Sequence, residues 1–160
     1  MILNRQNKIA LDEESLTAFL ARILRELQLG GTEVAIAFVT DQEIARWNKK
    51  YRGKSGPTDV LSFPALNAHR VAHFKRKARS KGAKQVGHLA PAPSMGYLGD
   101  IAIAPATAQR YAQINRRALE DELRVLMLHG LLHLLGYDHE TDRGQMNRVE
   151  RKIRRRLEIV

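Results

Sequence analysis

Three histidines lie close together in the last third of the 160-residue chain: His129, His133 and His139. If His129 and His133 lie on a helix, their spacing of four places both imidazoles on one face, about 6 Å apart, which is near enough to share one metal ion. Gly136 can end such a helix in the left-handed conformation, so that the chain reverses and brings His139 toward the other two. The spacing therefore predicts a metal site with three neutral nitrogen ligands.

The available ligand types restrict which metal this site would hold. The sequence contains no cysteine, so the metal must be held by histidine, aspartate or glutamate. Imidazole nitrogens suit zinc, although copper, nickel and iron also accept them. Three protein ligands leave one position of a tetrahedral zinc open, an arrangement typical of catalytic rather than structural zinc. We therefore expect one Zn²⁺ ion that acts as a Lewis acid.

A buried helix must hold the first two histidines. Residues 125–135 are apolar on nearly every side of a helix, apart from the histidines themselves. This pattern predicts a helix at the centre of the fold that begins near Ala118 and ends at Gly136. Within apolar surroundings each imidazole needs a polar partner, and a shared metal ion supplies one for both.

The remaining apolar pattern predicts both strands and helices around this central helix. Asp12 can cap a first helix that Gly30 and Gly31 end, and Thr40 with Glu43 fits a capping box that opens a short helix. The expected strands are 34–40, 60–63 and 100–104, with a further one within 1–11. The expected helices are 12–30, 40–47, 105–115, 118–136 and 143–157, and residues 51–57 form a turn.

Positive charge is concentrated in two segments of the chain. There are 27 Lys and Arg residues against 17 Asp and Glu residues, a formal net charge of +10. Seven of the basic residues lie in 70–84, which contains no acid, and seven more lie in 143–156. Such an excess favours a polyanionic partner, meaning nucleic acid or an acidic surface. A charge that serves solubility alone is the alternative.

The first of these segments belongs to a basic insertion at about 65–97. A connection of this length inside a small domain is usually functional or disordered, so it is either a solvated insertion or a contact for RNA phosphates. The second segment predicts a helix with a basic outer face, and such a face is more often merely solvated than a binding surface.

The histidine spacing also matches that of the zinc peptidases with the pattern H-E-x-x-H-x-x-G-x-x-H. In those enzymes the residue after the first histidine is the glutamate that serves as general base. Here that residue is Gly130. Peptide hydrolysis by that mechanism therefore lacks its base, and a metallopeptidase becomes a minor alternative.

Two further sequence blocks accompany the histidines. Residues 129–139 read HGLLHLLGYDH, residues 51–64 read YRGKSGPTDVLSFP, and residues 98–101 read LGDI. In this order the blocks resemble the signature of the bacterial YbeY-type metal-dependent endoribonucleases, which are associated with rRNA maturation and ribosome quality control. The connection between 64 and 98 is much longer than is usual in that family, so the shape of the cleft rim does not carry over.

The resemblance implies an α/β (α+β) fold, with a small mixed sheet of about four strands surrounded by helices and a buried central metal-binding helix. It implies one zinc ion held by His129, His133 and His139, and a catalytic arginine, Arg52, near the metal. A guanidinium pairs bidentately with phosphate oxygens and stabilises the charge that grows there in the transition state. Asp138 could orient a ligand histidine or simply form a turn. Asp59 and Ser62 are read as strand or turn residues, and Asp100 as a loop or edge carboxylate that closes a strand.

The expected function is a zinc-dependent hydrolase that cleaves single-stranded RNA, acting in 16S rRNA 3′-end maturation and late-stage ribosome quality control. Its partners would be rRNA and ribosomal particles, with no DNA. Zinc hydroxide and the neighbouring ribose 2′-hydroxyl both stay open as the nucleophile. A non-catalytic RNA- or ribosome-binding factor with a structural metal is the second hypothesis.

Length and hydropathy set the remaining expectations. A chain of 160 residues predicts a single domain over residues 1–160. No segment reaches the length of about 18 apolar residues that spans a bilayer, and the N-terminus has no signal pattern. We expect a cytoplasmic protein without a membrane partner.

Overall fold

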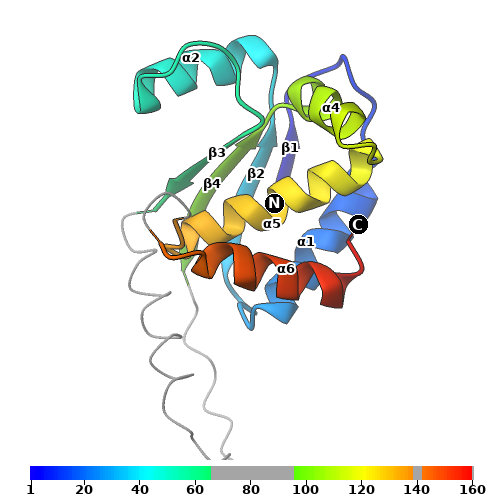
Figure 1. Ribbon diagram of the computed structural model, residues 1–160, viewed down its shortest axis with the longest axis vertical. Helices are drawn as coiled ribbons and strands as arrows, with labels where there is room; N and C mark the ends of the chain where they lie inside the picture. The colour runs from blue at the N-terminus through cyan, green and yellow to red at the C-terminus, as the bar shows by residue number, and fades with distance from the viewer. Residues whose placement is uncertain (66–95, 139–141, 160) are drawn as a thin grey trace, which may run out of the picture.

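The computed structural model describes residues 1–65, 96–138 and 142–159. The predicted basic insertion lies almost wholly outside these residues, and so does His139. The elements are β1 (Ile2–Asn4), α1 (Glu13–Glu26), β2 (Glu33–Phe38), α2 (Asp41–Arg52), β3 (Val60–Pro64), β4 (Tyr97–Ile103), α4 (Pro105–Ile114), α5 (Leu119–Leu134) and α6 (Gln145–Leu157) (Figure 1). None of the described helices is long and apolar enough to cross a membrane.

The four described strands form one mixed sheet in the order β1-β2-β4-β3. Ile36 of β2 lies in register between Ile2 of β1 and Ile101 of β4, and these three strands run parallel. β3 pairs with β4 in the antiparallel direction and forms an edge of the sheet. The predicted fold class, a mixed sheet of about four strands surrounded by helices, is confirmed.

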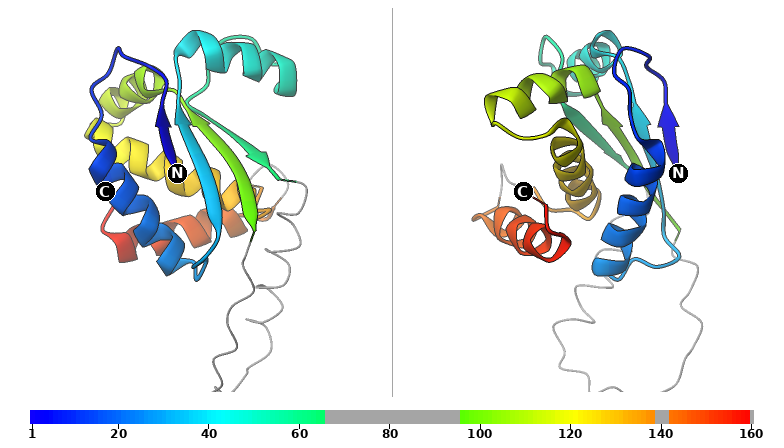
Figure 2. Two further views of the ribbon diagram at one scale, coloured as in Figure 1. Left: turned by 180° about the vertical axis from the view of Figure 1, so that it is seen from behind. Right: turned by 90° about the vertical axis from the view of Figure 1, so that its right-hand side faces the viewer.

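Alternate side chains of the strands pack against different helices on the two faces of the sheet. Ile36 and Ile101 belong to the larger apolar core, which contains residues of α1, α5 and α6. Leu61 and Ala102 point the other way, into a smaller core beneath Ile44 of α2. α5 lies across the sheet beside α1, and α6 packs on the outside of this layer (Figure 2). The helix that carries the two histidines is therefore enclosed between β-sheet and helix.

Two helix ends differ from their predicted positions. α1 ends at Glu26 instead of at Gly30, because Gln28 takes the left-handed conformation at φ 57° and turns Leu29 into the core. The Leu29 N–H then donates to the Leu24 carbonyl at 2.7 Å, so leucine packing decides the end of this helix without a glycine.

α2 is longer than predicted and continues past Trp47 to Arg52. Its true end is Gly53, which adopts the left-handed conformation at φ 66°. Three cations in the last turn suit the negative end of the helix dipole: Lys49, Lys50 and Arg52. Arg52 is consequently the last residue of a helix and not part of a flexible turn.

α5 approaches the sheet most closely at Gly130. A Cβ atom at this position would lie 2.8 Å from Cγ2 of Ile101 and 3.1 Å from Oγ of Ser62. The Ser62 hydroxyl donates to the Gly130 carbonyl at 3.1 Å. The missing side chain thus lets the backbone of α5 rest directly on β3 and β4.

We predict that Gly130→Ala destabilises the protein. The added methyl group overpacks this contact at a cost of about 1–3 kcal/mol, which exceeds the gain of about 1 kcal/mol from the better helix propensity of alanine. Urea unfolding followed by circular dichroism measures the difference. Gly30→Ala is the matched control, because no atom lies within 4 Å of a Cβ there. Equal stability of the two variants would contradict the close contact.

Candidate metal centre

His129 and His133 lie on α5 and direct the same ring atom toward each other. Their Nε2 atoms are 3.1 Å apart, and the rings meet edge to face with centroids 4.8 Å apart. Two imidazole nitrogens on a tetrahedral zinc, with Zn–N distances of about 2.05 Å, would be about 3.3 Å apart. This nitrogen pair therefore fits one edge of a zinc coordination tetrahedron.

The other ring nitrogen of His129 has a partner on α6. Nδ1 of His129 lies 3.0 Å from Oε2 of Glu150, whose side chain is 13% exposed. A carboxylate only accepts hydrogen bonds, so Nδ1–H donates to Glu150 and Nε2 is the ring nitrogen that faces a metal ion. A carboxylate behind a histidine fixes the ring and its tautomer in many zinc sites.

Glu150 was not identified from the sequence. The signal that could have found it is its place on the inner side of α6, four residues after Met146 and three before Ile153, both of which are buried. A carboxylate at the border of a buried face needs a partner. Which partner it finds depends on how α6 packs against α5, and the sequence does not give that packing.

The end of α5 turns the chain as predicted. Gly136 has φ 84°, and its N–H donates to the His133 carbonyl at 2.9 Å. The N–H of Tyr137 reaches back to the Leu132 carbonyl at 3.1 Å, which completes a Schellman motif. The chain therefore reverses direction within one turn of His133.

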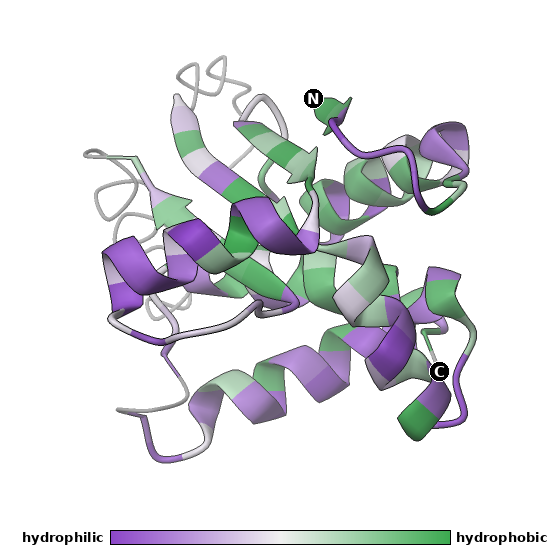
Figure 3. Ribbon diagram, turned by 90° about the horizontal axis from the view of Figure 1, so that it is seen from above, coloured by the Kyte–Doolittle hydropathy of each residue, from purple (hydrophilic) through white to green (hydrophobic). Residues whose placement is uncertain are grey.

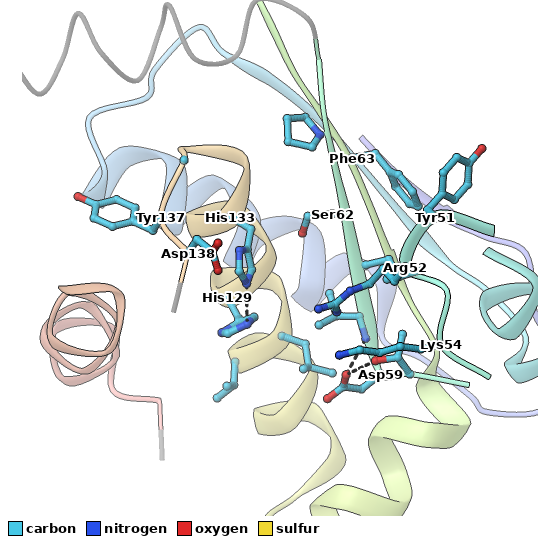
Figure 4. A pocket seen from close by; sticks show the side chains of 17 residues that line it. Tyr51, Arg52, Lys54, Asp59, Ser62, Phe63, His129, His133, Tyr137 and Asp138 are labelled. Carbon is cyan, nitrogen blue, oxygen red and sulfur yellow. Dashed lines mark hydrogen bonds between the residues drawn. The ribbon is translucent and has the colours of Figure 1, made fainter. Parts of the chain in front are cut away.

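Two residues at this turn bear on the metal site. Asp138 follows with its carboxylate directed toward His133 (Figure 4). His139, the predicted third ligand, is the next residue and lies outside the described residues. Within the described ranges no group of three or more His, Cys, Asp or Glu side chains is placed so that it could hold a metal ion. The described part of the site is accordingly a pair of histidines with carboxylates beside it.

A cleft of about 820 Å³ lies in front of the two histidines. Its walls come from α5 and the turn after it, from β3, and from the segment that joins α2 to β3. Arg52 lines the cleft opposite the histidines, and its guanidinium points toward them (Figure 4). Residues far apart in the sequence thus bring a cation and two metal-binding groups to one cavity.

The segment between Arg52 and β3 is held in place by two polar side chains. Nδ2 of the buried Asn48 donates to the Gly56 carbonyl at 3.0 Å, which ties the loop to α2. The Asp59 carboxylate accepts from Oγ1 of Thr58 at 3.1 Å and from the Val60 N–H at 2.8 Å, where β3 begins. Asp59 thus has structural contacts, as expected of a strand or turn residue. Together these hydrogen bonds fix the segment that follows Arg52.

Asp100 lies inside β4 and not at the end of a strand, and its side chain forms a local contact. It accepts a hydrogen bond of 2.6 Å from the Tyr97 hydroxyl. Burial, together with this hydrogen bond, raises the pKa of Tyr97 to about 12, so the phenol keeps its proton at neutral pH. Neither residue lies among those that line the cleft.

Comparison with known proteins places this arrangement in a family. The model of the family "Endoribonuclease YbeY" matches residues 1–158. A protein of that name from Koribacter versatilis is 33% identical over 99% of this chain and 86% of its own length. Another, from Pelotomaculum thermopropionicum, is 37% identical over 99% of this chain and 97% of its own length.

A solved structure agrees with the sequence comparisons. The solution structure of TM1509 from Thermotoga maritima superposes with a TM-score of 0.59 at 25% identity, covering 98% of this chain and 89% of the other. The family resemblance predicted from the three sequence blocks is confirmed. The chain belongs to the endoribonuclease YbeY family.

Proposed function

We propose that the protein is a zinc-dependent endoribonuclease that hydrolyses phosphodiester bonds in single-stranded RNA. The observation that carries the proposal is the pair of Nε2 atoms 3.1 Å apart at a cleft whose opposite wall presents Arg52. The shared name of the relatives, endoribonuclease, supports RNA as the substrate. Maturation of the 16S rRNA 3′ end and late-stage quality control of ribosomes in the cytoplasm are the proposed cellular roles.

In this proposal His129, His133 and His139 hold one zinc ion. Zinc bound there would supply Lewis-acid chemistry at a phosphoryl oxygen. Glu150 would hold the His129 ring through Nδ1 and so orient Nε2 for the metal. The chain turns at Gly136, three residues before His139 in the sequence.

Arg52 is the proposed phosphate-binding residue. Its guanidinium enters the cleft from the end of α2, on the side opposite the two histidines (Figure 4). A phosphodiester between them would contact the metal on one side and two N–H donors of the guanidinium on the other. The arginine would then stabilise the negative charge that grows on the phosphoryl oxygens during cleavage.

We predict that His133→Ala abolishes RNA cleavage, by about a hundredfold or more, because it removes one of the metal ligands. The zinc content should fall, whereas the affinity for RNA should stay within about threefold, since phosphate contacts supply most of it. Cleavage of single strands derived from rRNA, metal analysis and circular dichroism are measured on the same preparations. Loss of folding together with the metal, and no cleavage by the wild type, would instead favour a binding factor with a structural metal.

We predict that Arg52→Ala lowers kcat by about 10²–10³-fold, the usual cost of removing a group that stabilises transition-state charge. Arg52→Lys should recover part of this loss, because lysine keeps the charge but not the bidentate geometry. The zinc content should not change. Lys49→Ala is the matched control, because Lys49 belongs to the same helical turn but does not line the cleft. An equal loss of activity in the control would contradict a specific role for Arg52.

We predict that Glu150→Ala weakens zinc binding by about 10–100-fold, the usual cost of losing a carboxylate behind a ligand histidine. Glu150→Gln should fall between this variant and the wild type, because the amide oxygen still accepts from Nδ1. Competition with a chromophoric chelator at one fixed pH gives the affinities. Glu158→Gln, which changes the acid at the C-terminal end of α6, should bind zinc as the wild type does. Unchanged affinity in Glu150→Ala would show that the carboxylate serves folding alone.

A further inference from the structure

The outer surface of α6 carries a cluster of cations. Five of them line a shallow hollow of about 380 Å³ and are called here the α6 basic face: Arg148, Arg151, Lys152, Arg155 and Arg156. The apolar side of the same helix is buried in the core. Figure 3 shows α6 as a largely hydrophilic helix at the margin of the molecule.

The protein itself neutralises little of this charge. Arg156 pairs with Glu26 of α1 at 2.5 Å. The Arg148 and Arg151 guanidinium groups donate to backbone carbonyls, of Arg143 and Asn147, which carry no net charge. Across the described part of the chain, no carboxylate forms an ion pair with any of the remaining four cations of the α6 basic face.

The arrangement along the helix also brings like charges together. Arg148 and Lys152 are four residues apart, and so are Arg151 and Arg155, so each pair lies side by side on the helix surface. Like charges at this spacing repel and destabilise a helix. A bound polyanion would remove the repulsion, which favours a ligand over plain solvation.

The α6 basic face adjoins the metal centre through the helix itself. Glu150, on the inner side of α6, contacts His129. Nη1 of Arg154 lies 3.9 Å from the other oxygen of Glu150 and continues the positive charge from this side toward the outer surface. The metal centre and the α6 basic face are thus connected through a single helix.

The chemistry of the hollow favours phosphodiesters over a lipid surface. A helix that lies in a membrane interface needs an exposed apolar face, but Met146, Ile153 and Leu157 are buried against the core. The large hydrophobic residues that are exposed in the described ranges lie elsewhere in the chain. Guanidinium forks that converge on a concave surface suit phosphate oxygens.

We propose that the α6 basic face binds the phosphodiester backbone of the RNA substrate outside the cleft, as a second docking surface. The proposal rests on the proposed function, because it takes the bound polyanion to be the strand whose scissile phosphate lies in the cleft. It predicts that long RNA gains affinity from α6, and that the chemical step on a short oligonucleotide does not depend on it.

The test compares two sets of four substitutions to glutamine. The first set removes the four unpaired cations of the α6 basic face: Arg148, Arg151, Lys152 and Arg155. The matched control removes the same charge from exposed cations elsewhere in the protein: Lys8, Arg22, Arg25 and Arg46. Binding of a labelled 20-nucleotide single-stranded RNA is followed by fluorescence anisotropy between 50 and 300 mM KCl. Every protein in this arm also carries His133→Ala, so that the RNA stays intact.

The α6 set should lower the slope of log K against log salt by about 2–3, since each lost phosphate contact on a single strand removes about 0.7. Affinity at 100 mM KCl should fall by about tenfold or more. The control should change the slope by less than about 1. A third variant, with Arg148, Arg151 and Arg155 replaced by lysine, should keep the slope and also shows that α6 tolerates substitution.

Three outcomes would overturn the proposal. An equal fall in both sets would mean that only net charge matters, and an unchanged slope in the α6 set would mean a solvated face. Loss of binding to vesicles that contain phosphatidylserine, with RNA binding intact, would assign the face to lipid.

Cleavage is measured on proteins without His133→Ala, and there the α6 set should cleave a four-nucleotide RNA with unchanged kcat. If the wild type cleaves no RNA, the proposed function fails, whereas the binding slopes still decide whether α6 contacts RNA.

Discussion

The contact between α5 and the sheet at Gly130 sets the position of the two histidines in the cleft. A helix that rested on side chains at this point would lie further from β3 and β4. The missing side chain brings the backbone carbonyl of Gly130 within reach of the Ser62 hydroxyl. The neighbouring His129, on the same turn of α5, is thereby fixed in height above the sheet. The position of His133, one turn further along, is then fixed as well, because a buried helix is rigid.

This contact also explains why the histidine spacing of a zinc peptidase occurs here without the peptidase glutamate. A glutamate at position 130 would drive its Cβ into Ile101 before its carboxylate could reach a substrate. The position faces the sheet and not the cleft, so no general base could act from it. A reaction at phosphorus, helped by a cation such as Arg52, suits a site built this way better than peptide hydrolysis does.

The local parts of the site were predictable from the sequence. The spacing of His129 and His133, and the glycine that ends their helix, follow from backbone geometry within one element. Arg52 was found only through the resemblance to a family, because its approach to the histidines depends on how α2 and β3 meet. Glu150 was missed for the same reason: its contact joins two helices across 21 residues. The end of α1 was misplaced because the burial of Leu29, and not the glycine pair, decides where that helix stops.

α6 connects the metal centre with the basic surface, because its inner side faces the protein core and its outer side faces the solvent. Its inner side must supply an apolar surface to the core and one carboxylate to His129, while its outer side carries cations with few partners. A helix covered in like charges gains little stability from its surface, so the buried residues Met146, Ile153 and Leu157 must hold it in place. The same packing that keeps the basic surface assembled thus keeps Glu150 against His129. Neutralising the outer cations should therefore leave the contact between Glu150 and His129 in place, because that contact depends on the buried side of α6.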